Sequence, residues 1–100
     1  MEAYQGYHII RCYEAGVFFA QIKAHDKENR IVTLQNARKL FYWNGAAAVE
    51  QIAMEGVKDP AGSKFTMIVP EMDVMNPIQI IPCTREAVEC IQTVIAWKRT

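Results

Sequence analysis

Hydrophobic and polar positions alternate over the first third of the chain, in three runs that are rich in aromatic and β-branched residues. The runs cover Tyr7–Tyr13, Val17–Ala24 and Arg30–Leu34. Ala15-Gly16 separates the first run from the second, and the polar turn Asp26–Asn29 separates the second from the third. Short strands joined by tight turns form antiparallel hairpins, so this part of the chain predicts an antiparallel meander.

The period changes to that of a helix after Gly45. Val49, Ile52 and Ala53 recur at the spacing of one helical face, which predicts a helix over Ala46–Glu55. Asn44 is a suitable N-cap because its side chain can accept hydrogen bonds from the free amides of the first turn. Gly56 supplies the left-handed residue that ends many helices.

The last third of the chain predicts two more extended segments and a second helix. Lys64–Val69 reads as a strand that ends before Pro70, and Gln79–Ile81 reads as a strand closed by Pro82. Thr84 is the expected N-cap of the second helix. Trp97, beyond this helix, must either dock back on the domain or meet a partner. The apolar face of the helix comprises Ala87, Val88, Ile91, Val94 and Ile95.

The order of these elements predicts a small α+β fold, an antiparallel meander sheet covered by two short helices. The chain has 100 residues and no linker or repeat, so residues 1–100 form a single domain in this prediction. More than half of the residues are hydrophobic, ten are aromatic and the net charge is zero. Because so small a domain cannot bury all of its aromatic side chains and nothing repels a second copy, we expect a homo-oligomer.

Charge and cysteine usage exclude several classes of protein. Eleven acidic residues cancel eleven basic ones, which makes nucleic acid an unfavourable partner. No apolar run approaches the roughly 18 residues of a membrane span, and residues 1–6 do not resemble a signal peptide. We therefore expect no membrane association, a cytoplasmic location and three reduced cysteines. The two histidines do not combine with these cysteines in a zinc-ligand spacing.

The segment from Asn36 to Gly45 carries the most distinctive chemistry in the sequence. It places two adjacent cations before three consecutive aromatic residues. Aromatic rings can stack on a base, an arginine fork suits a phosphate, and asparagine can pair with a base edge or a ribose. The alternative is that the aromatic residues belong to the core, while Arg38 is solvated or holds a structural contact. The candidate ligand-binding residues are Asn36, Arg38, Lys39, Tyr42, Trp43 and Asn44.

The same segment closely resembles a family of short uncharacterised proteins encoded by tailed phages and prophages. The resemblance extends over almost the whole chain, and it departs from the family pattern at Ala20, Lys39 and Phe41, where Gly, Arg and Trp are expected. It implies a phage-encoded protein that acts in the cytoplasm of a host bacterium, and it implies no particular activity. The matching residues are Ala15-Gly16-Val17-Phe18, Asn36-Ala37-Arg38, Tyr42-Trp43, Gly45-Ala46, Gly56-Val57, Pro60, Lys64-Phe65, Pro82-Cys83-Thr84 and Trp97.

The sequence offers little support for an enzyme or a cofactor. Cys83 precedes a predicted helix whose N-terminus could lower the pKa of its thiol, but no base is positioned for it by the sequence. His8 and Cys12 share a strand face at a separation of roughly 13 Å, and His25 lies in a polar turn. We therefore expect a protein without catalytic activity or cofactor.

Two functions follow from these observations. In the first, a homo-oligomer sequesters a nucleotide-like small molecule that serves as a signal in bacterial immunity, with the ligand held between subunits. In the second, the protein binds a host or phage protein through its aromatic surface. Arg38 and Asn36 discriminate between the two functions. A protein interface needs the aromatic residues, but it has no special need of an arginine that binds phosphate.

Overall fold

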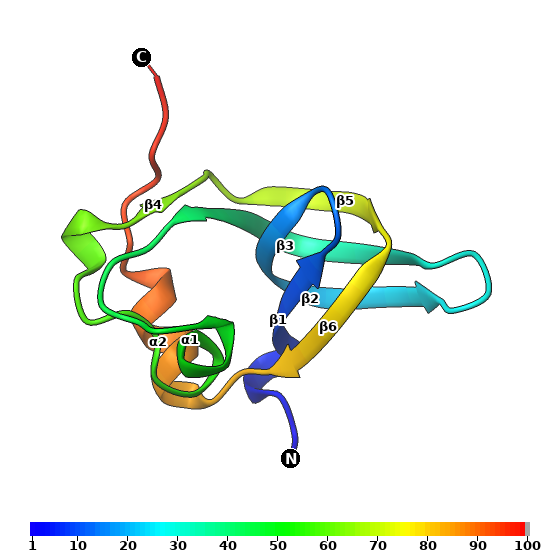
Figure 1. The fold of residues 1–100 in the computed structure, drawn as a ribbon, viewed down its shortest axis with the longest axis horizontal. Helices are drawn as coiled ribbons and strands as arrows, with labels where there is room; N and C mark the ends of the chain where they lie inside the picture. The colour runs from blue at the N-terminus through cyan, green and yellow to red at the C-terminus, as the bar shows by residue number, and fades with distance from the viewer. Residues whose placement is uncertain (100) are drawn as a thin grey trace.

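The computed structural model describes residues 1–99, and its main element is a six-stranded antiparallel sheet (Figure 1). The order along the sheet is β4-β3-β2-β1-β6, and β5 also pairs with β3. Two helices complete a small α+β fold, as predicted. The strands are β1 (Tyr7–Cys12), β2 (Gly16–Asp26), β3 (Ile31–Tyr42), β4 (Lys64–Phe65), β5 (Val69–Met75) and β6 (Pro77–Pro82).

The third strand is much longer than the sequence predicted. It begins at Ile31, one residue after the predicted start at Arg30, and continues beyond Leu34 to Tyr42. Asn36 interrupts its regular geometry with a φ of 50°, a left-handed conformation that asparagine tolerates better than most residues. Most of the segment that was expected to form a ligand site is therefore the second half of β3, while Trp43 and Asn44 lie in the loop that follows it. Its side chains point to two different faces, so they cannot all line one pocket.

The strands in the last third of the chain begin and end at other residues than predicted. Lys64–Val69 contains the two-residue β4, an irregular segment at 66–68 and the first residue of β5. Pro70 does not end this region, because it lies near the start of β5, at an edge of the sheet where no partner strand needs its missing amide. The predicted extended segment at Gln79–Ile81 is the central part of β6.

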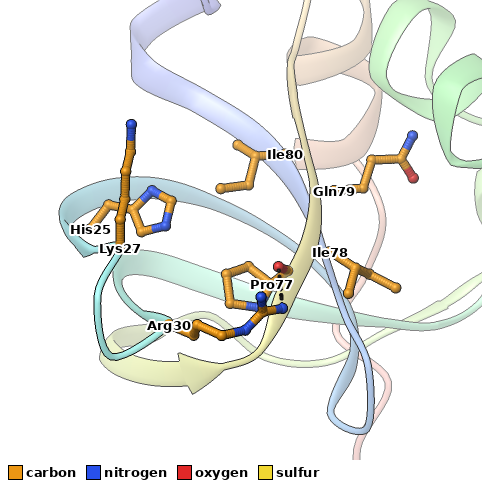
Figure 2. A pocket seen from close by; sticks show the side chains of 7 residues that line it. All are labelled: His25, Lys27, Arg30, Pro77, Ile78, Gln79 and Ile80. Atoms are coloured by element: carbon orange, nitrogen blue, oxygen red, sulfur yellow. Dashed lines mark hydrogen bonds between the residues drawn. The ribbon is translucent and has the colours of Figure 1, made fainter.

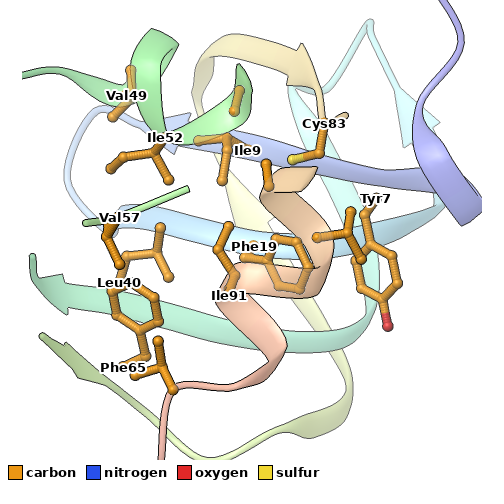
Figure 3. Close-up of a cluster of buried hydrophobic side chains, with 14 residues drawn as sticks. Tyr7, Ile9, Phe19, Leu40, Val49, Ile52, Val57, Phe65, Cys83 and Ile91 are labelled. Atoms are coloured by element: carbon orange, nitrogen blue, oxygen red, sulfur yellow. The ribbon is translucent and has the colours of Figure 1, made fainter. Parts of the chain in front are cut away.

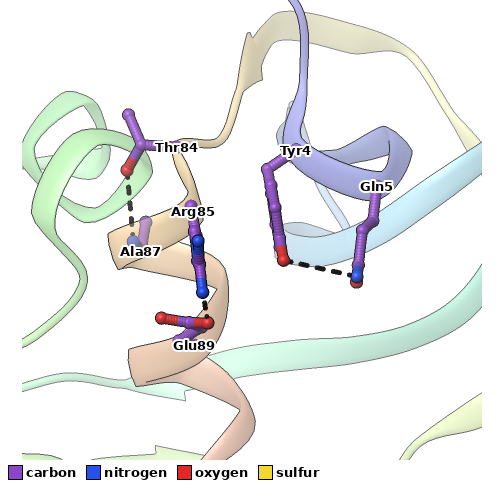
Figure 4. A network of polar contacts seen from close by, with 6 residues as sticks. All are labelled: Tyr4, Gln5, Thr84, Arg85, Ala87 and Glu89. Atoms are coloured by element: carbon purple, nitrogen blue, oxygen red, sulfur yellow. Dashed lines mark hydrogen bonds and ion pairs between the residues drawn. The ribbon is translucent and has the colours of Figure 1, made fainter.

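The two helices lie together against one face of the sheet (Figure 1). The second helix, α2 (Arg85–Gln92), begins as predicted, because the Thr84 hydroxyl accepts a hydrogen bond of 3.1 Å from the Ala87 amide. In the first turns of α2, the Arg85 guanidinium also pairs with Glu89 at 3.1 Å (Figure 4).

The first helix, α1 (Val49–Glu55), is shorter than predicted and has no side-chain cap. Asn44 does not cap it, which corrects the prediction. Its amide group instead donates to Asp59 at 3.1 Å, because the loop after the helix returns to Asn44. The predicted stop is confirmed, since Gly56 has a φ of 76° and its amide donates to Ile52.

The sheet curls because its two ends are joined by a single residue. β5 pairs with β3 and β6 pairs with β1, yet β5 and β6 are consecutive in the chain and meet at Asn76. The Asn76 amide donates to the Arg30 carbonyl at 2.9 Å, and its carbonyl accepts from the Tyr13 amide at 3.1 Å. Asn76 has a φ of 57°, another left-handed position occupied by asparagine. This corner ties the ends of both hairpins together.

Hydrophobic side chains form two cores on opposite faces of the curled sheet. Neighbours such as Ile9 and Ile10 point to different cores, as the alternation of a strand requires. The core under the helices, drawn in Figure 3, includes Ile9, Phe19, Leu40, Ile52, Ala53, Phe65, Val88 and Ile91. The core on the concave face comprises Ile10, Cys12, Phe18, Ala20, Val32, Leu34, Ala37 and Val74.

Ile95 is the exception to the predicted apolar face of the second helix. Ala87, Val88, Ile91 and Val94 are buried as predicted, but Ile95 is 87% exposed. The helix ends at Gln92, and the chain then turns so that Ala96 forms a parallel bridge with Phe65. Beyond the helix end the helical spacing no longer decides which side chains face the core.

We expect the substitution Ile91→Ala to lower the free energy of unfolding by about 2–5 kcal/mol, because it leaves a cavity in a fully packed core. Ile95→Ala removes the same atoms from an exposed position and should change stability by less than about 0.5 kcal/mol. Urea denaturation of the two variants measures both effects. Equal midpoints for the two variants would contradict the packing described for α2.

Candidate functional site

Arg38 is the most deeply buried of the six candidate ligand-binding residues. Only 4% of it is exposed, and its guanidinium lies 5.6 Å from the centre of the Phe65 ring. Nε donates to the Thr66 carbonyl at 2.9 Å, and a terminal nitrogen donates to the Ile91 carbonyl at 3.0 Å. Ile91 lies in the last turn of α2, where its carbonyl also accepts from the Val94 amide at 3.2 Å and where a positive charge is favourable.

Burial lowers the pKa of the Arg38 guanidinium from its ordinary value, although an arginine stays charged in proteins. Both of its hydrogen bonds go to main-chain carbonyls of this chain. The structure therefore agrees with the alternative for this residue, a structural contact that holds a helix end. In this arrangement the guanidinium is not presented to a ligand.

The two asparagines of the segment also bond within the domain. The Asn36 amide group donates to the Gln21 side chain at 2.7 Å across β2 and β3. The main-chain amide of Asn44 donates to the Ser63 hydroxyl at 3.1 Å, which adds to the bond from its side chain to Asp59. Asn44 thus fastens the loop that contains the short 3-10 turn Pro60–Gly62.

The remaining candidates differ in exposure. Trp43 is half-buried and packs against the core under the helices, and Lys39 is half-buried beside Gly16. Tyr42 is exposed. The structure therefore does not bring the six candidates together: Arg38 and Trp43 face the helix side, Asn36 and Asn44 bond to neighbouring segments, and Tyr42 lies at the surface.

An exposed aromatic pair, formed by Phe41 of this segment and Trp97 near the C-terminus, was not included in the predicted site. Phe41 and Trp97 stack with ring centres 4.8 Å apart and planes inclined by 21°, although 57% of Phe41 and 46% of Trp97 are exposed. The main-chain amide of Trp97 donates to the Phe65 carbonyl at 2.8 Å, which holds the C-terminal segment beside β4. The tail therefore docks back on the domain, but the tryptophan ring stays accessible.

Positive charge surrounds this pair. The Lys64 ammonium lies 5.4 Å from the centre of the Trp97 ring, and Tyr42 is the cross-strand partner of Lys64. Trp97, Lys98 and Arg99 line a hollow of about 340 Å³. We call Phe41, Tyr42, Lys64 and Trp97 the aromatic surface. The sequence could signal Trp97 as an unplaced aromatic residue, but its stacking on Phe41 depends on the bridge between Phe65 and Ala96.

Two of the three cysteines lie in surroundings that disfavour a reactive thiolate. Burial raises the pKa of the Cys83 thiol to about 12, and burial also raises the pKa of Cys12. The Cys90 thiol donates to the Val57 carbonyl at 3.2 Å. Within residues 1–99, no three His, Cys, Asp or Glu side chains are grouped closely enough to hold a metal ion. The described helices also include none that is long and apolar enough to cross a membrane.

Residues 5–91 match the model of a protein family described as a domain of unknown function, DUF6948. The chain belongs to this family. The match confirms that the protein is a member of an uncharacterised family, while a phage origin stays a prediction. No curated protein and no solved structure matches the chain.

We expect Arg38→Ala to lower the free energy of unfolding by about 2–4 kcal/mol, because a buried carbonyl at Ile91 and a part-buried carbonyl at Thr66 lose a charged hydrogen-bond donor. Arg38→Lys should be intermediate, because one ammonium replaces a planar fork that reaches two acceptors. The matched control is Arg85→Ala, which removes an exposed ion pair with Glu89. Its loss should lower the free energy of unfolding by less than about 0.5 kcal/mol. Chemical denaturation checks all three, and an unchanged midpoint for Arg38→Ala would refute the structural role.

Proposed function

We propose that this protein is a binding module that uses its aromatic surface to hold an acidic segment of a partner protein. The observation that carries the proposal is the stacked pair of Phe41 and Trp97, which the fold fixes in place while leaving about half of each residue exposed. Tyrosine, tryptophan and phenylalanine are enriched in protein interfaces, where they act as anchors.

The fixed geometry of the pair favours binding. Trp97 is held by its main-chain bond to Phe65 and by its stacking on Phe41, so less side-chain entropy is lost when a partner packs against it. A pair that only completed the core would be covered by other parts of the domain. Here the C-terminal segment that carries Trp97 runs beside β4, at the edge of the sheet (Figure 1).

The charges around the aromatic surface favour an acidic partner. Lys64 lies over the Trp97 ring, and Lys98 and Arg99 follow it in the chain. A second copy of this chain, related by a two-fold axis, would place these cations against one another, and like charges across an interface are unfavourable. Carboxylates on either side of an apolar side chain match both features of the surface.

The sequestration of a nucleotide-like molecule at residues 36–44 has less support. That function depended on Arg38 as the phosphate ligand, and this guanidinium is bonded to Thr66 and Ile91 inside the domain. The sequence resemblance supports a phage-encoded protein, and the cytoplasm of a host bacterium is then the place where it would meet its partner.

A displayed library of random peptides tests the proposal. Peptides selected on the wild-type protein should carry acidic residues flanking one aromatic or aliphatic residue. The double variant Phe41→Ser/Trp97→Ser should bind them at least about 30-fold more weakly, which corresponds to the loss of about 2 kcal/mol typical of an interface anchor. Fluorescence anisotropy with a labelled, selected peptide measures the affinities.

The matched control is Tyr13→Ser, which removes a still more exposed aromatic ring at the turn between β1 and β2. It should leave peptide affinity unchanged. Peptides without acidic residues, or equal affinity for the double variant, would overturn the proposal. So would sedimentation that shows a wild-type oligomer dissociated by the double variant, because the aromatic surface would then be a contact between copies.

A further inference from the structure

A second surface feature lies near the opposite end of β3 from the aromatic surface, where the end of the β2–β3 hairpin approaches β6. His25, Lys27 and Arg30 of the hairpin and residues 77–80 of β6 line a hollow of about 280 Å³ (Figure 2). Its location follows from the Asn76 corner, which bonds to Arg30 and leads directly into β6. These residues are about 50 positions apart in sequence, and only the curl of the sheet brings them together.

The polar groups at this hollow are predominantly cationic. Within residues 1–99, the side chains that line it include an ammonium, a guanidinium and an imidazole but no carboxylate. Asp26 is in the same turn, but its two oxygens accept hydrogen bonds of 3.1 and 2.8 Å from the main chain and side chain of Asn29. Gln79 points to the other side of β6, where its amide donates to Glu50 (Figure 2).

Arg30 occupies a position where the backbone favours a different residue. Its φ of 56° is left-handed, a conformation that glycine and asparagine adopt more readily. One terminal nitrogen of Arg30 donates a long hydrogen bond of 3.4 Å to the Pro77 carbonyl, which aims the guanidinium along β6 (Figure 2). The remaining nitrogens of the fork can donate to a ligand, since an arginine carries five N–H groups.

The floor of the hollow is apolar. Pro77, Ile78 and Ile80 contribute hydrocarbon surface beside the cationic groups. We propose that this hollow binds a small molecule that carries a phosphate group and one ring. Arg30 and Lys27 hold the phosphate, the His25 imidazole donates a further hydrogen bond, and the ring lies against the side chains of β6. A volume of about 280 Å³ suits such a compact ligand.

Titration with three simple probes tests this site. Phenyl phosphate has both features of the ligand, inorganic phosphate lacks the ring, and phenol lacks the phosphate. Amide shifts in NMR spectra should move at residues 25–30 and 77–80. Phenyl phosphate should bind most tightly, inorganic phosphate at least threefold more weakly, and phenol without measurable affinity. Added salt should weaken phosphate binding, because exposed charges are screened.

Variants separate binding from folding. Lys27→Gln and Arg30→Gln should each weaken phenyl phosphate binding at least tenfold. Arg30→Gly should remove the contact between the guanidinium and the phosphate. It should not lower the melting temperature, because glycine adopts this left-handed conformation without strain. The matched control is Lys23→Gln on the same hairpin, whose ammonium is paired with Glu71 at 2.7 Å. It should leave affinity unchanged.

No binding of phenyl phosphate at millimolar concentration would overturn the proposal, as would equal affinity for wild type and Arg30→Gln. Shifts confined to residues outside the hollow would also overturn it. The Phe41→Ser/Trp97→Ser variant should bind phenyl phosphate as wild type does. The outcome at this hollow is therefore independent of whether the aromatic surface binds an acidic partner.

Discussion

The buried guanidinium of Arg38 ties the end of α2 to β3 and to the segment that follows β4, which already pairs with β3. It starts from β3, bonds the irregular segment between β4 and β5 at Thr66, and closes the end of α2 at Ile91. Burying a charge is costly unless its hydrogen bonds are made, and both of these are close to ideal length. The position of the C-terminal segment depends on this contact, because the chain leaves α2 just beyond Ile91 to reach β4 and place Trp97 on Phe41.

A second constraint, the Asn76 corner, decides how the opposite end of the sheet is built. Its two main-chain hydrogen bonds, to Arg30 and from Tyr13, hold β5 and β6 against the ends of both hairpins. The concave core is enclosed as a result, with Val74 of β5 buried and Ile80 of β6 packed against it. The same closure brings the cations of the hairpin next to the apolar residues of β6.

Local signals in the sequence were sufficient where a structural feature depends on neighbouring residues. The Thr84 cap, the Gly56 stop and the burial of Ile91 follow from short-range chemistry, and the structure confirms them.

Distant segments decide the features that the sequence did not predict. Asn44 was misplaced because the loop at Asp59 returns to it, and Ile95 because the bridge to Phe65 turns the chain after α2. The sequence allowed two interpretations of Arg38, a phosphate-binding residue or a structural contact. Only the positions of Thr66 and Ile91 distinguish them. The Phe41–Trp97 pair and the hollow at His25 each combine residues about 50 positions apart, which no local pattern can show.

The two surfaces lie near opposite ends of β3. Arg30 precedes the strand and Phe41 is near its end, so nearly the whole of β3 separates them, a length of about 36 Å at the rise of an extended strand. Charges separated by more than the Debye length of about 10 Å at 0.1 M salt are largely screened, so a phosphate at the hollow would exert little direct force on an acidic segment at the aromatic surface. Any coupling would have to pass through β3, which is paired along both edges and packed on both faces. A strand held in this way resists sliding, because a shift of one residue would exchange its two buried faces. The fold therefore allows the two surfaces to be occupied together and independently.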